Sequence, residues 1–269
     1  MKTQNLKVVF TAIILATMGF GLKAQDRLFT YTYQSNVLGK GQRELEVWNT
    51  ARMGKSDYFF RLDHRTEFEM GLGKNLQTAF YLNLTTKTFA LGDSLKSLIT
   101  ENEISFSNEW KLKLMDPVAH PFGLALYAEY GIGGKEFELE GKILLDKKIK
   151  KFTFALNGVY EFETEAETED SELLWEKESK LVAHFAIAYS INPNFHLTME
   201  NQIQNVIKDR DLEHSALFSG LGFSYSQENY FINFSFLPQI VSFKASTNKG
   251  LDLNEFEKVQ CRLLFSYVL

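Results

Sequence analysis

The chain has 269 residues, of which 45% are hydrophobic, and carries a formal net charge of −5 at pH 7. This acidic balance argues against a nucleic-acid partner, because such proteins carry clustered basic charge. The single cysteine, Cys261, excludes an internal disulfide, and 24 Phe and 11 Tyr against four Pro are typical of a protein with many long strands.

The first 24 residues have the composition of a secretory signal peptide. Two lysines begin it, residues 8–22 form an apolar run, and Ala24 ends a cleavage site. The run of about 15 residues is shorter than the roughly 20 that a membrane-spanning helix requires. We therefore expect a cleaved signal peptide at 1–24 and one exported domain at 25–269.

The clearest pattern in the chain is the stretch Tyr58–Lys87, where apolar and polar residues alternate with a period of two. Two runs of roughly a dozen residues flank a turn-forming stretch, Gly71–Asn75. The period indicates strands, and the runs are longer than the usual five or six residues of a strand. The polar face of the first run carries consecutive charges, namely Arg61, Asp63, Arg65, Glu67 and Glu69.

The same alternation predicts twelve strands along the chain. Their approximate extents are 42–51, 58–70, 76–87, 103–114, 122–130, 136–145, 152–163, 180–189, 195–203, 217–225, 230–237 and 259–269. The strand at 230–237 is ambiguous, because both of its faces carry apolar residues. Short turns alternate with longer connections, of which 89–100, 164–174, 206–213 and 238–254 are the longest. An even number of long amphipathic strands with such connections is typical of a bacterial outer-membrane barrel.

Two all-β folds fit alternating strands. A soluble β-sandwich would bury its apolar face against a second sheet and would use shorter strands. A closed barrel places the apolar face in lipid and leaves no backbone group unpaired. Strand length, export and the aromatic residues near both strand ends favour the second fold. We predict an all-β, transmembrane antiparallel up-and-down β-barrel of about 12 strands.

The signal ending at Ala24-Gln25, the twelve strands and the last strand, Gln260–Leu269, resemble the small outer-membrane β-barrels of Bacteroidota-type bacteria. Many of those are known only as channel or transporter barrels of unknown function. The resemblance implies a location in the bacterial outer membrane, contact with outer-membrane lipid and insertion by the outer-membrane assembly machinery. About 20 residues separate Gln25 from the first strand, too few for the plug domain of a TonB-dependent importer.

The inward faces of the predicted strands place thirteen candidate pore-lining residues in the lumen. These are Arg61, Asp63, Arg65, Glu67, Glu69, Glu109, Lys111, Glu138, Glu140, Lys142, His184, Glu200 and Arg262. One interpretation is a passive channel for small solutes whose acidic lining favours cations. The other is a salt-bridge network that fills a small barrel and makes it a structural, non-conducting one.

His64 stands on the lipid face, where a polar residue is costly and therefore informative. Thr66 follows it on the same face. Outer-membrane phospholipase A is similar in having twelve strands and a His and a Ser two residues apart on its outer surface. Here a Thr replaces that Ser, and the sequence identifies no third residue to orient the imidazole. We expect no enzyme, and keep a lipid-acting activity as the second alternative.

Other candidate sites give weaker signals. His184 and Glu200 could be inward neighbours, either as a proton-sensitive pair or as a structural hydrogen bond. The acidic stretch 163–172 is expected to be an outer loop, and its spacing matches no EF-hand. The chain contains no glycine-rich phosphate loop, zinc spacing or catalytic triad motif, so we expect no cofactor and no metal.

Overall fold

The computed structural model describes residues 27–90, 97–169, 172–245 and 250–269, apart from the side chains of 167–169 and 172–173. The predicted signal peptide lies outside these residues. None of the described residues belongs to a helix long and apolar enough to span a membrane. The described strands are β1 (Arg43–Met53), β2 (Phe59–Gly73), β3 (Leu76–Ala90), β4 (Leu98–Met115), β5 (Gly123–Gly133), β6 (Glu136–Ile149), β7 (Phe152–Glu169), β8 (Glu172–Ser190), β9 (Phe195–Lys208), β10 (Asp211–Ser226), β11 (Tyr230–Lys244) and β12 (Val259–Val268).

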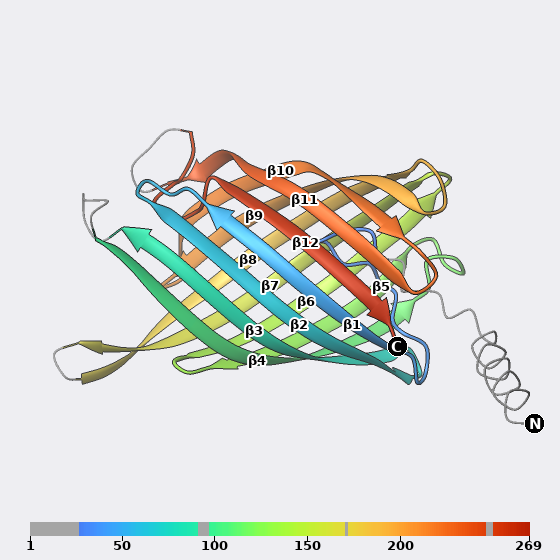
Figure 1. Ribbon diagram of the computed structural model, residues 1–269, viewed down its shortest axis with the longest axis horizontal. Coiled ribbons are helices and arrows are strands. Elements are labelled where there is room, and N and C mark those ends of the chain that lie inside the picture. Colours follow the sequence, from blue (N-terminus) through green and yellow to red (C-terminus); the bar gives the residue numbers. More distant parts are fainter. Residues whose placement is uncertain (1–26, 91–96, 170–171, 246–249) are drawn as a thin grey trace, which may run out of the picture.

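These twelve strands form one closed barrel (Figure 1). Each strand pairs antiparallel with the next, and β12 closes the barrel by pairing with β1 from Glu44↔Val268 to Met53↔Val259. The predicted all-β, twelve-stranded, up-and-down barrel is therefore confirmed. Closure matters because it leaves no sheet edge with unpaired backbone groups in the membrane.

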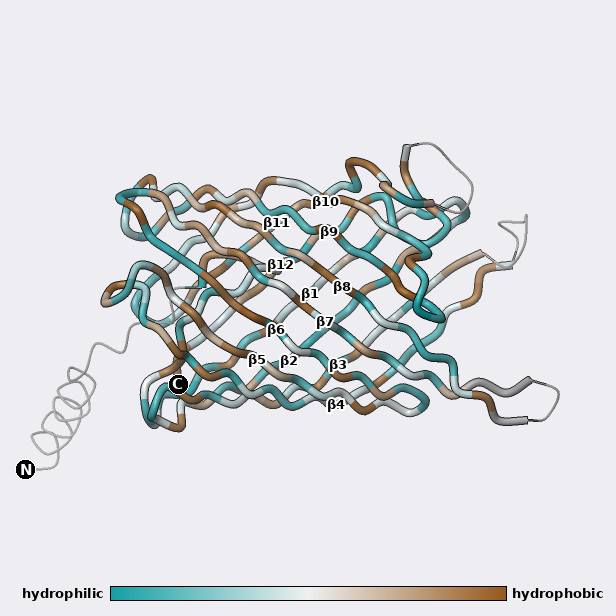
Figure 2. Tube along the Cα trace, turned by 180° about the vertical axis from the view of Figure 1, so that it is seen from behind, coloured by the Kyte–Doolittle hydropathy of each residue, from teal (hydrophilic) through white to brown (hydrophobic). Residues whose placement is uncertain are grey.

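The two faces of the wall differ in polarity, as the period of two requires. Along β5, Ala125 and Tyr127 are buried, whereas Leu126 and Tyr130 are exposed on the outer face. Hydrophilic and hydrophobic residues alternate along the strands in the same way (Figure 2). Large apolar side chains exposed on the outside of a closed barrel are the lipid-facing surface of an outer-membrane barrel.

The strand that the sequence left ambiguous, β11, has a definite register. Phe231, Asn233, Ser235 and Leu237 are buried inside, and Phe236 is exposed on the outer face. Phe231 and Leu237 are apolar residues on the inward face because they pack in interior clusters with Leu264 and Phe256. Apolar packing inside the lumen thus explains why the alternation fails here.

Several of the predicted outer loops are wrong, because the strands continue through them. β7 and β8 pair as far as Glu169↔Glu172, and β9 and β10 pair as far as Lys208↔Asp211. The predicted acidic loop at 163–172 is therefore mostly the end of a long hairpin, which extends beyond the barrel at the end opposite the C-terminus (Figure 1). Hairpin pairing satisfies the backbone without an apolar face, which explains why the alternation did not indicate it.

The largest difference from the sequence prediction is that residues 27–38 lie inside the barrel. We call Arg27–Leu38 the inner segment. Residues 27–35 and Leu38 are buried, although the segment forms no strand. It reaches the rim where the short turns and the C-terminus lie, and Leu38 N–H donates to the Gln77 side chain there at 2.9 Å. Short turns face the periplasm in such barrels, so we call this rim the periplasmic end.

Gly71 of β2 lets the chain turn from the inner segment into the wall. Its N–H donates to the carbonyl of Gln42 at 3.0 Å, and its carbonyl accepts from Gly41 N–H at 2.8 Å. A Cβ atom at residue 71 would overlap the carbonyl oxygens of Leu38 and Gly39. The inner segment therefore passes this strand at a distance that only glycine allows.

Replacing Gly71 by Ala should loosen the inner segment and destabilise the barrel by about 1–3 kcal/mol, since two backbone carbonyls must move. Thermal unfolding in detergent, together with protease cleavage of the inner segment, measures both effects. Gly134→Ala is the matched control, because nothing lies within 4 Å of its Cβ position. Equal stability of the two variants would contradict the tight approach at Gly71.

Candidate functional site

The inner segment divides the lumen into two parts. Toward the end opposite the C-terminus, the barrel contains a cavity of about 410 Å³, which we call the vestibule. Tyr31 and Tyr33 of the inner segment are among its lining residues, together with inward side chains from most of the strands. Below them, the periplasmic half is filled by the inner segment and by buried side chains such as Tyr81 and Phe231.

Charge in the vestibule is balanced. Among the described residues that line it, seven are acidic and seven are basic. The acidic residues are Asp63, Glu129, Glu138, Glu140, Glu161, Glu255 and Glu257, and the basic residues are Arg52, Lys55, Arg61, Arg65, Lys142, Lys180 and Arg262. The vestibule is therefore not a purely acidic surface.

Most vestibule charges form ion pairs, and several of these pairs join neighbouring or nearby strands. Arg52 of β1 bridges Asp63 and Glu257 at 3.0 and 2.8 Å. Arg65 of β2 reaches across the lumen to Glu129 of β5 at 3.0 Å. Lys180 of β8 pairs with Glu161 of β7 at 3.2 Å, whereas Lys142 pairs with Glu140 of the same strand, β6, at 2.7 Å. These pairs hold the side chains in fixed positions around the cavity.

Two basic residues are arranged differently. Arg262 of β12 lies over the ring of Tyr31, 3.7 Å from its centroid, and donates to Thr50 Oγ1 at 2.8 Å. Within the described part of the chain it makes no ion pair with a carboxylate, so its charge is available to an anionic group. Lys55 stands in the loop after β1, where burial lowers its pKa although Glu255 and Glu257 oppose the shift.

Inward side chains from strands distant in sequence hold the inner segment. The Glu200 carboxylate of β9 accepts hydrogen bonds from the backbone N–H groups of Thr30, Tyr31 and Thr32, at 2.8 to 2.9 Å. The hydroxyl groups of Thr30 and Thr32 donate to the same carboxylate. These charge-assisted hydrogen bonds are stronger than neutral ones, so Glu200 is the main polar anchor of the segment.

Amide and carboxylate groups of the nearby strands β7 and β6 complete the attachment. The Asn157 amide of β7 accepts from Tyr33 N–H at 2.7 Å and donates to the Tyr33 carbonyl at 2.9 Å. The Asp146 carboxylate of β6 accepts from Ser35 N–H at 2.8 Å. A segment without strand partners thus obtains its backbone hydrogen bonds from the barrel wall, as buried backbone groups require.

Arg27 brings a cation into the deepest part of the lumen. Its guanidinium lies 4.2 Å from the ring centroid of Tyr33 and 4.3 Å from that of Trp48. It donates to Glu46 Oε2 at 3.1 Å, and both side chains of this ion pair are almost fully buried. The inner segment therefore compensates part of the negative charge that β1 and β2 carry inward.

All thirteen candidate lumen residues lie on the inward side of the wall. Eight line the vestibule, namely Arg61, Asp63, Arg65, Glu138, Glu140, Lys142, His184 and Arg262. Five lie deeper and are buried, namely Glu67, Glu69, Glu109, Lys111 and Glu200. The expected neighbour relation of His184 and Glu200 is wrong, because His184 pairs with Gln202 and Ala186 pairs with Glu200. Glu200 binds the inner segment instead.

On the outer wall, His64 has two hydrogen-bonding neighbours, whereas the sequence indicated only Thr66. Its Nδ1 lies 2.9 Å from Asn49 Oδ1, and its Nε2 lies 3.2 Å from Thr66 Oγ1. Asn49 is the third residue that the sequence did not reveal. It stands on β1, directly opposite His64 in the strand register, so only the pairing of β1 with β2 brings the two together.

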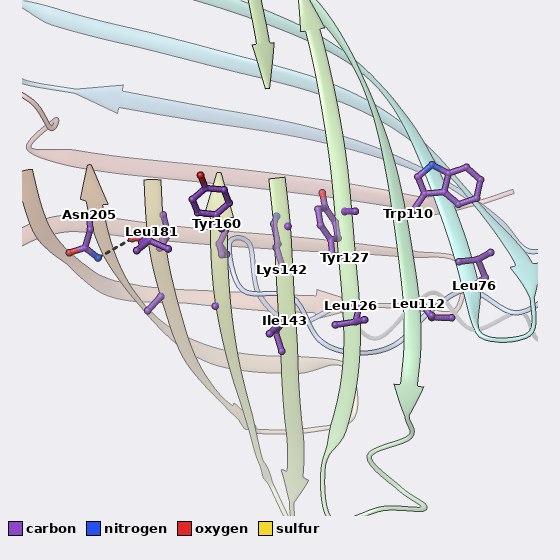
Figure 3. Close-up of a pocket in the computed structure, with 16 residues that line it drawn as sticks. Leu76, Trp110, Leu112, Leu126, Tyr127, Lys142, Ile143, Tyr160, Leu181 and Asn205 are labelled. Carbon is purple, nitrogen blue, oxygen red and sulfur yellow. Dashed lines mark hydrogen bonds between the residues drawn. The ribbon is translucent and has the colours of Figure 1, made fainter. Parts of the chain in front are cut away.

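The outer wall also has an apolar groove of about 760 Å³ across several strands (Figure 3). Its lining includes the small residues Ala128, Gly141, Gly158 and Ala183 beside larger ones such as Trp110. The strand alternation turns this surface to the membrane, and its apolar lining suits acyl chains. It belongs to the lipid-facing wall and not to the lumen.

A family model described as a family of unknown function (DUF6662) matches residues 22–269. No curated protein matches the sequence. The COG4313 outer membrane channel from Pseudomonas putida F1 is similar in structure, with a TM-score of 0.64 at 10% identity over 90% of this chain and 100% of that one. The β domain of the Bordetella autotransporter BrkA gives 0.58 at 5% identity, over 86% and 100% of the two chains. The NanC porin gives 0.53 at 12% identity, over 84% and 100%. At these identities the likeness shows the fold, which a channel and an autotransporter domain share.

Replacing Glu200 by Gln should lower the stability of the folded barrel by about 1.5–3 kcal/mol, since charge-assisted hydrogen bonds to buried backbone groups are weakened. Thermal unfolding monitored by circular dichroism measures this loss. Glu101→Gln, at an exposed position on β4, serves as the control. An unchanged unfolding temperature for Glu200→Gln would show that the inner segment is not anchored there.

Proposed function

For this chain, which belongs to DUF6662, a family of unknown function, we propose that the barrel is an outer-membrane channel for small solutes, closed at its periplasmic half by the inner segment. The carrying observation is a solute-sized vestibule whose floor is a segment held by hydrogen bonds and not by strand pairing. The inner segment can therefore leave the lumen without disrupting the strand pairing of the barrel wall. Outer-membrane lipid around the wall and insertion by the outer-membrane assembly machinery belong to the same proposal.

The chemistry of the vestibule suits small polar solutes that carry charge. Arg262 offers a cation beside Tyr31, and Glu138 offers a carboxylate that forms no ion pair among the described residues. Residues already engaged in ion pairs surround these two and keep the cavity from collapsing. A zwitterion or a small charged molecule fits this balanced lining better than an apolar ligand does.

Release of the inner segment would change the selectivity of the pore. The segment carries Arg27, and the wall behind it carries buried carboxylates at Glu46, Glu67, Glu69 and Glu109. Once Arg27 leaves, these groups line an acidic passage, which favours cations. Cation preference is therefore a property of the open state in this proposal, and the closed state conducts little.

Deleting residues 27–38 should convert a mostly closed barrel into a constantly open, cation-selective pore. Planar-bilayer recordings under a salt gradient measure both conductance and reversal potential. Gln at both Glu138 and Glu140 should reduce the cation preference of the deletion variant, because two lumen charges are removed. Folding of each variant is checked by its heat-dependent mobility in gel electrophoresis. A folded deletion variant without conductance would support the alternative of a structural, plugged barrel.

A second candidate function is supported by the hydrogen-bonded chain Asn49–His64–Thr66. An amide oxygen can only accept, so the contact with Asn49 assigns the His64 proton to Nδ1 and leaves Nε2 to accept from the Thr66 hydroxyl. This is the arrangement that activates a hydroxyl nucleophile. Its place on the lipid face would make an acyl ester of a lipid the substrate, with Thr66 attacking the carbonyl and His64 passing the proton to the leaving alcohol.

Channel function remains our first proposal, because a hydrolase also needs donors for the developing oxyanion, and strand pairing already occupies the backbone N–H groups around Thr66. Hydrolysis of phospholipid in mixed micelles tests the second candidate. It predicts a loss of more than about a hundredfold for His64→Ala and for Thr66→Val. Asn201→Leu, which alters another outward amide, should leave the rate unchanged. Equal rates for all four proteins would reject the relay as a catalytic site.

A further inference from the structure

Four carboxylates face one another inside the barrel where β1 pairs with β2. The strand register places Glu44 opposite Glu69 and Glu46 opposite Glu67. All four residues are at most 2% exposed. Like charges directly across two strands repel, and a buried charge is costly unless it is paired or bound to a metal. The interior must therefore supply positive charge or protons at this place.

Protein groups satisfy only part of this cluster. Arg27 and Trp48 both donate to Oε2 of Glu46, at 3.1 and 2.9 Å, and Ser266 donates to Oε1 of Glu44. By contrast, both carboxylate oxygens of Glu67 and Oε2 of Glu69 have no hydrogen-bond partner among the described residues. These fully buried, unpartnered oxygens are an observation independent of the clustering itself.

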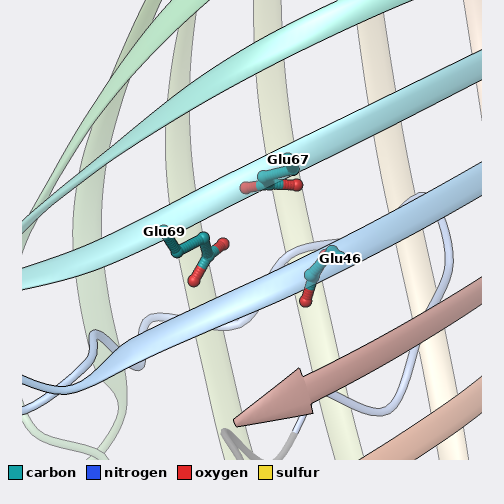
Figure 4. Close-up of side chains that lie close together, drawn as sticks. All are labelled: Glu46, Glu67 and Glu69. Atoms are coloured by element: carbon teal, nitrogen blue, oxygen red, sulfur yellow. The ribbon is translucent and has the colours of Figure 1, made fainter. Parts of the chain in front are cut away.

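The three carboxylates of Glu46, Glu67 and Glu69 converge (Figure 4). One oxygen from each lies within 4.8 Å of the others. Oxygens bound to the same Ca²⁺ ion lie 2.3–2.6 Å from it, so up to about 5 Å from one another. Three carboxylates offer up to six oxygens, and Ca²⁺ takes six to eight. Spacing, ligand type and burial thus agree with a hard divalent cation.

We propose that Glu46, Glu67 and Glu69 bind one divalent cation, best suited to Ca²⁺, between β1, β2 and the inner segment. Glu46 then contacts two cations at once, because its Oε2 accepts from Arg27 and one of its carboxylate oxygens lies within 4.8 Å of oxygens of Glu67 and Glu69. The bound ion neutralises the like-charge pairs and fixes the carboxylate on which Arg27 rests. It therefore stabilises the wall of β1 and β2 behind the inner segment.

A second acidic cluster provides the comparison. Glu138, Glu140 and Glu161 of the vestibule also bring one oxygen each within 4.8 Å. They are partly exposed, and Lys142 and Lys180 already pair with two of them, at 2.7 and 3.2 Å. Protein cations thus form ion pairs with two members of the vestibule cluster. In the deep cluster only Glu46 has an ion-pair partner among the described residues, namely Arg27, and buried Lys111 interacts with Glu46 and Glu69 without forming an ion pair.

The test uses the full-length mature protein in detergent, first treated with EDTA and then dialysed against Ca²⁺ or Mg²⁺. Elemental analysis should find one Ca²⁺ per chain. The unfolding temperature should rise by roughly 5–10 °C when free Ca²⁺ is about a hundredfold above its dissociation constant, and less with Mg²⁺. Glu67→Gln and Glu69→Gln should each remove the bound ion and the Ca²⁺-dependent shift, whereas Glu140→Gln in the vestibule should keep both.

Measurements on the wild-type protein alone can contradict the proposed cation site. A wild-type protein that binds no Ca²⁺, and whose unfolding temperature ignores it, would show that shared carboxyl protons neutralise the cluster. In that case Glu67→Gln should raise the unfolding temperature, because the folded barrel no longer has to take up a proton to neutralise this carboxyl. Neither measurement involves conductance. A barrel that does not conduct would therefore not contradict the cation site, and a barrel that binds no cation would not contradict the channel proposal.

Discussion

The structure depends on one requirement, that every backbone N–H and C=O group within the membrane finds a partner in the wall. The pairing of β1 with β12 meets it by closing the sheet. Closure in turn fixes which residues face lipid, since a shift of one residue would carry Arg61, Asp63 and Arg65 outward. At about 2–4 kcal/mol for each Arg near the membrane midplane, such a shift is excluded. The lumen composition is therefore a consequence of wall pairing.

The inner segment fills space in the lumen, and its buried backbone groups also need hydrogen-bond partners. Twelve strands enclose a space that their own side chains do not fill at the periplasmic half, where small residues such as Ala155, Ala186 and Ala188 face inward and are buried against the segment's Leu28 and Phe29. A strand-like partner for the segment is impossible, because the wall has no free edge. Side chains such as Glu200 and Asn157 replace the edge and supply the hydrogen bonds that a neighbouring strand would give. An attachment of this kind is specific but separable from the wall.

Sequence periodicity predicted the number of strands, their antiparallel order and the inward position of the charged residues, because a half-lipid wall imposes a strict period of two. It did not predict the inner segment, whose residues follow no amphipathic pattern that distinguishes the interior of a barrel from its wall. Two signals in the sequence could have indicated it: inward amide and carboxylate groups without a charged partner on the next strand, such as Asn157 and Glu200, and small inward residues beside them. The sequence did not predict the contact of Asn49 with His64 for another reason, because only the register of β1 against β2 places the two residues side by side.

Glu46 links the closure of the lumen by the inner segment to the stability of the buried carboxylates on β1 and β2. Its carboxylate is the meeting point of Arg27, the Trp48 indole and the acidic side chains of β2. If Arg27 left while the cluster kept its full charge, the repulsion among Glu46, Glu67 and Glu69 would rise, so charge on this wall favours the closed state. A cation bound to the cluster lowers that repulsion in both states, and it also withdraws charge from the carboxylate that holds Arg27. Positive charge at this site thus stabilises the wall more than it stabilises the ion pair of Arg27 with Glu46, and the balance between the two effects decides how readily the inner segment is released.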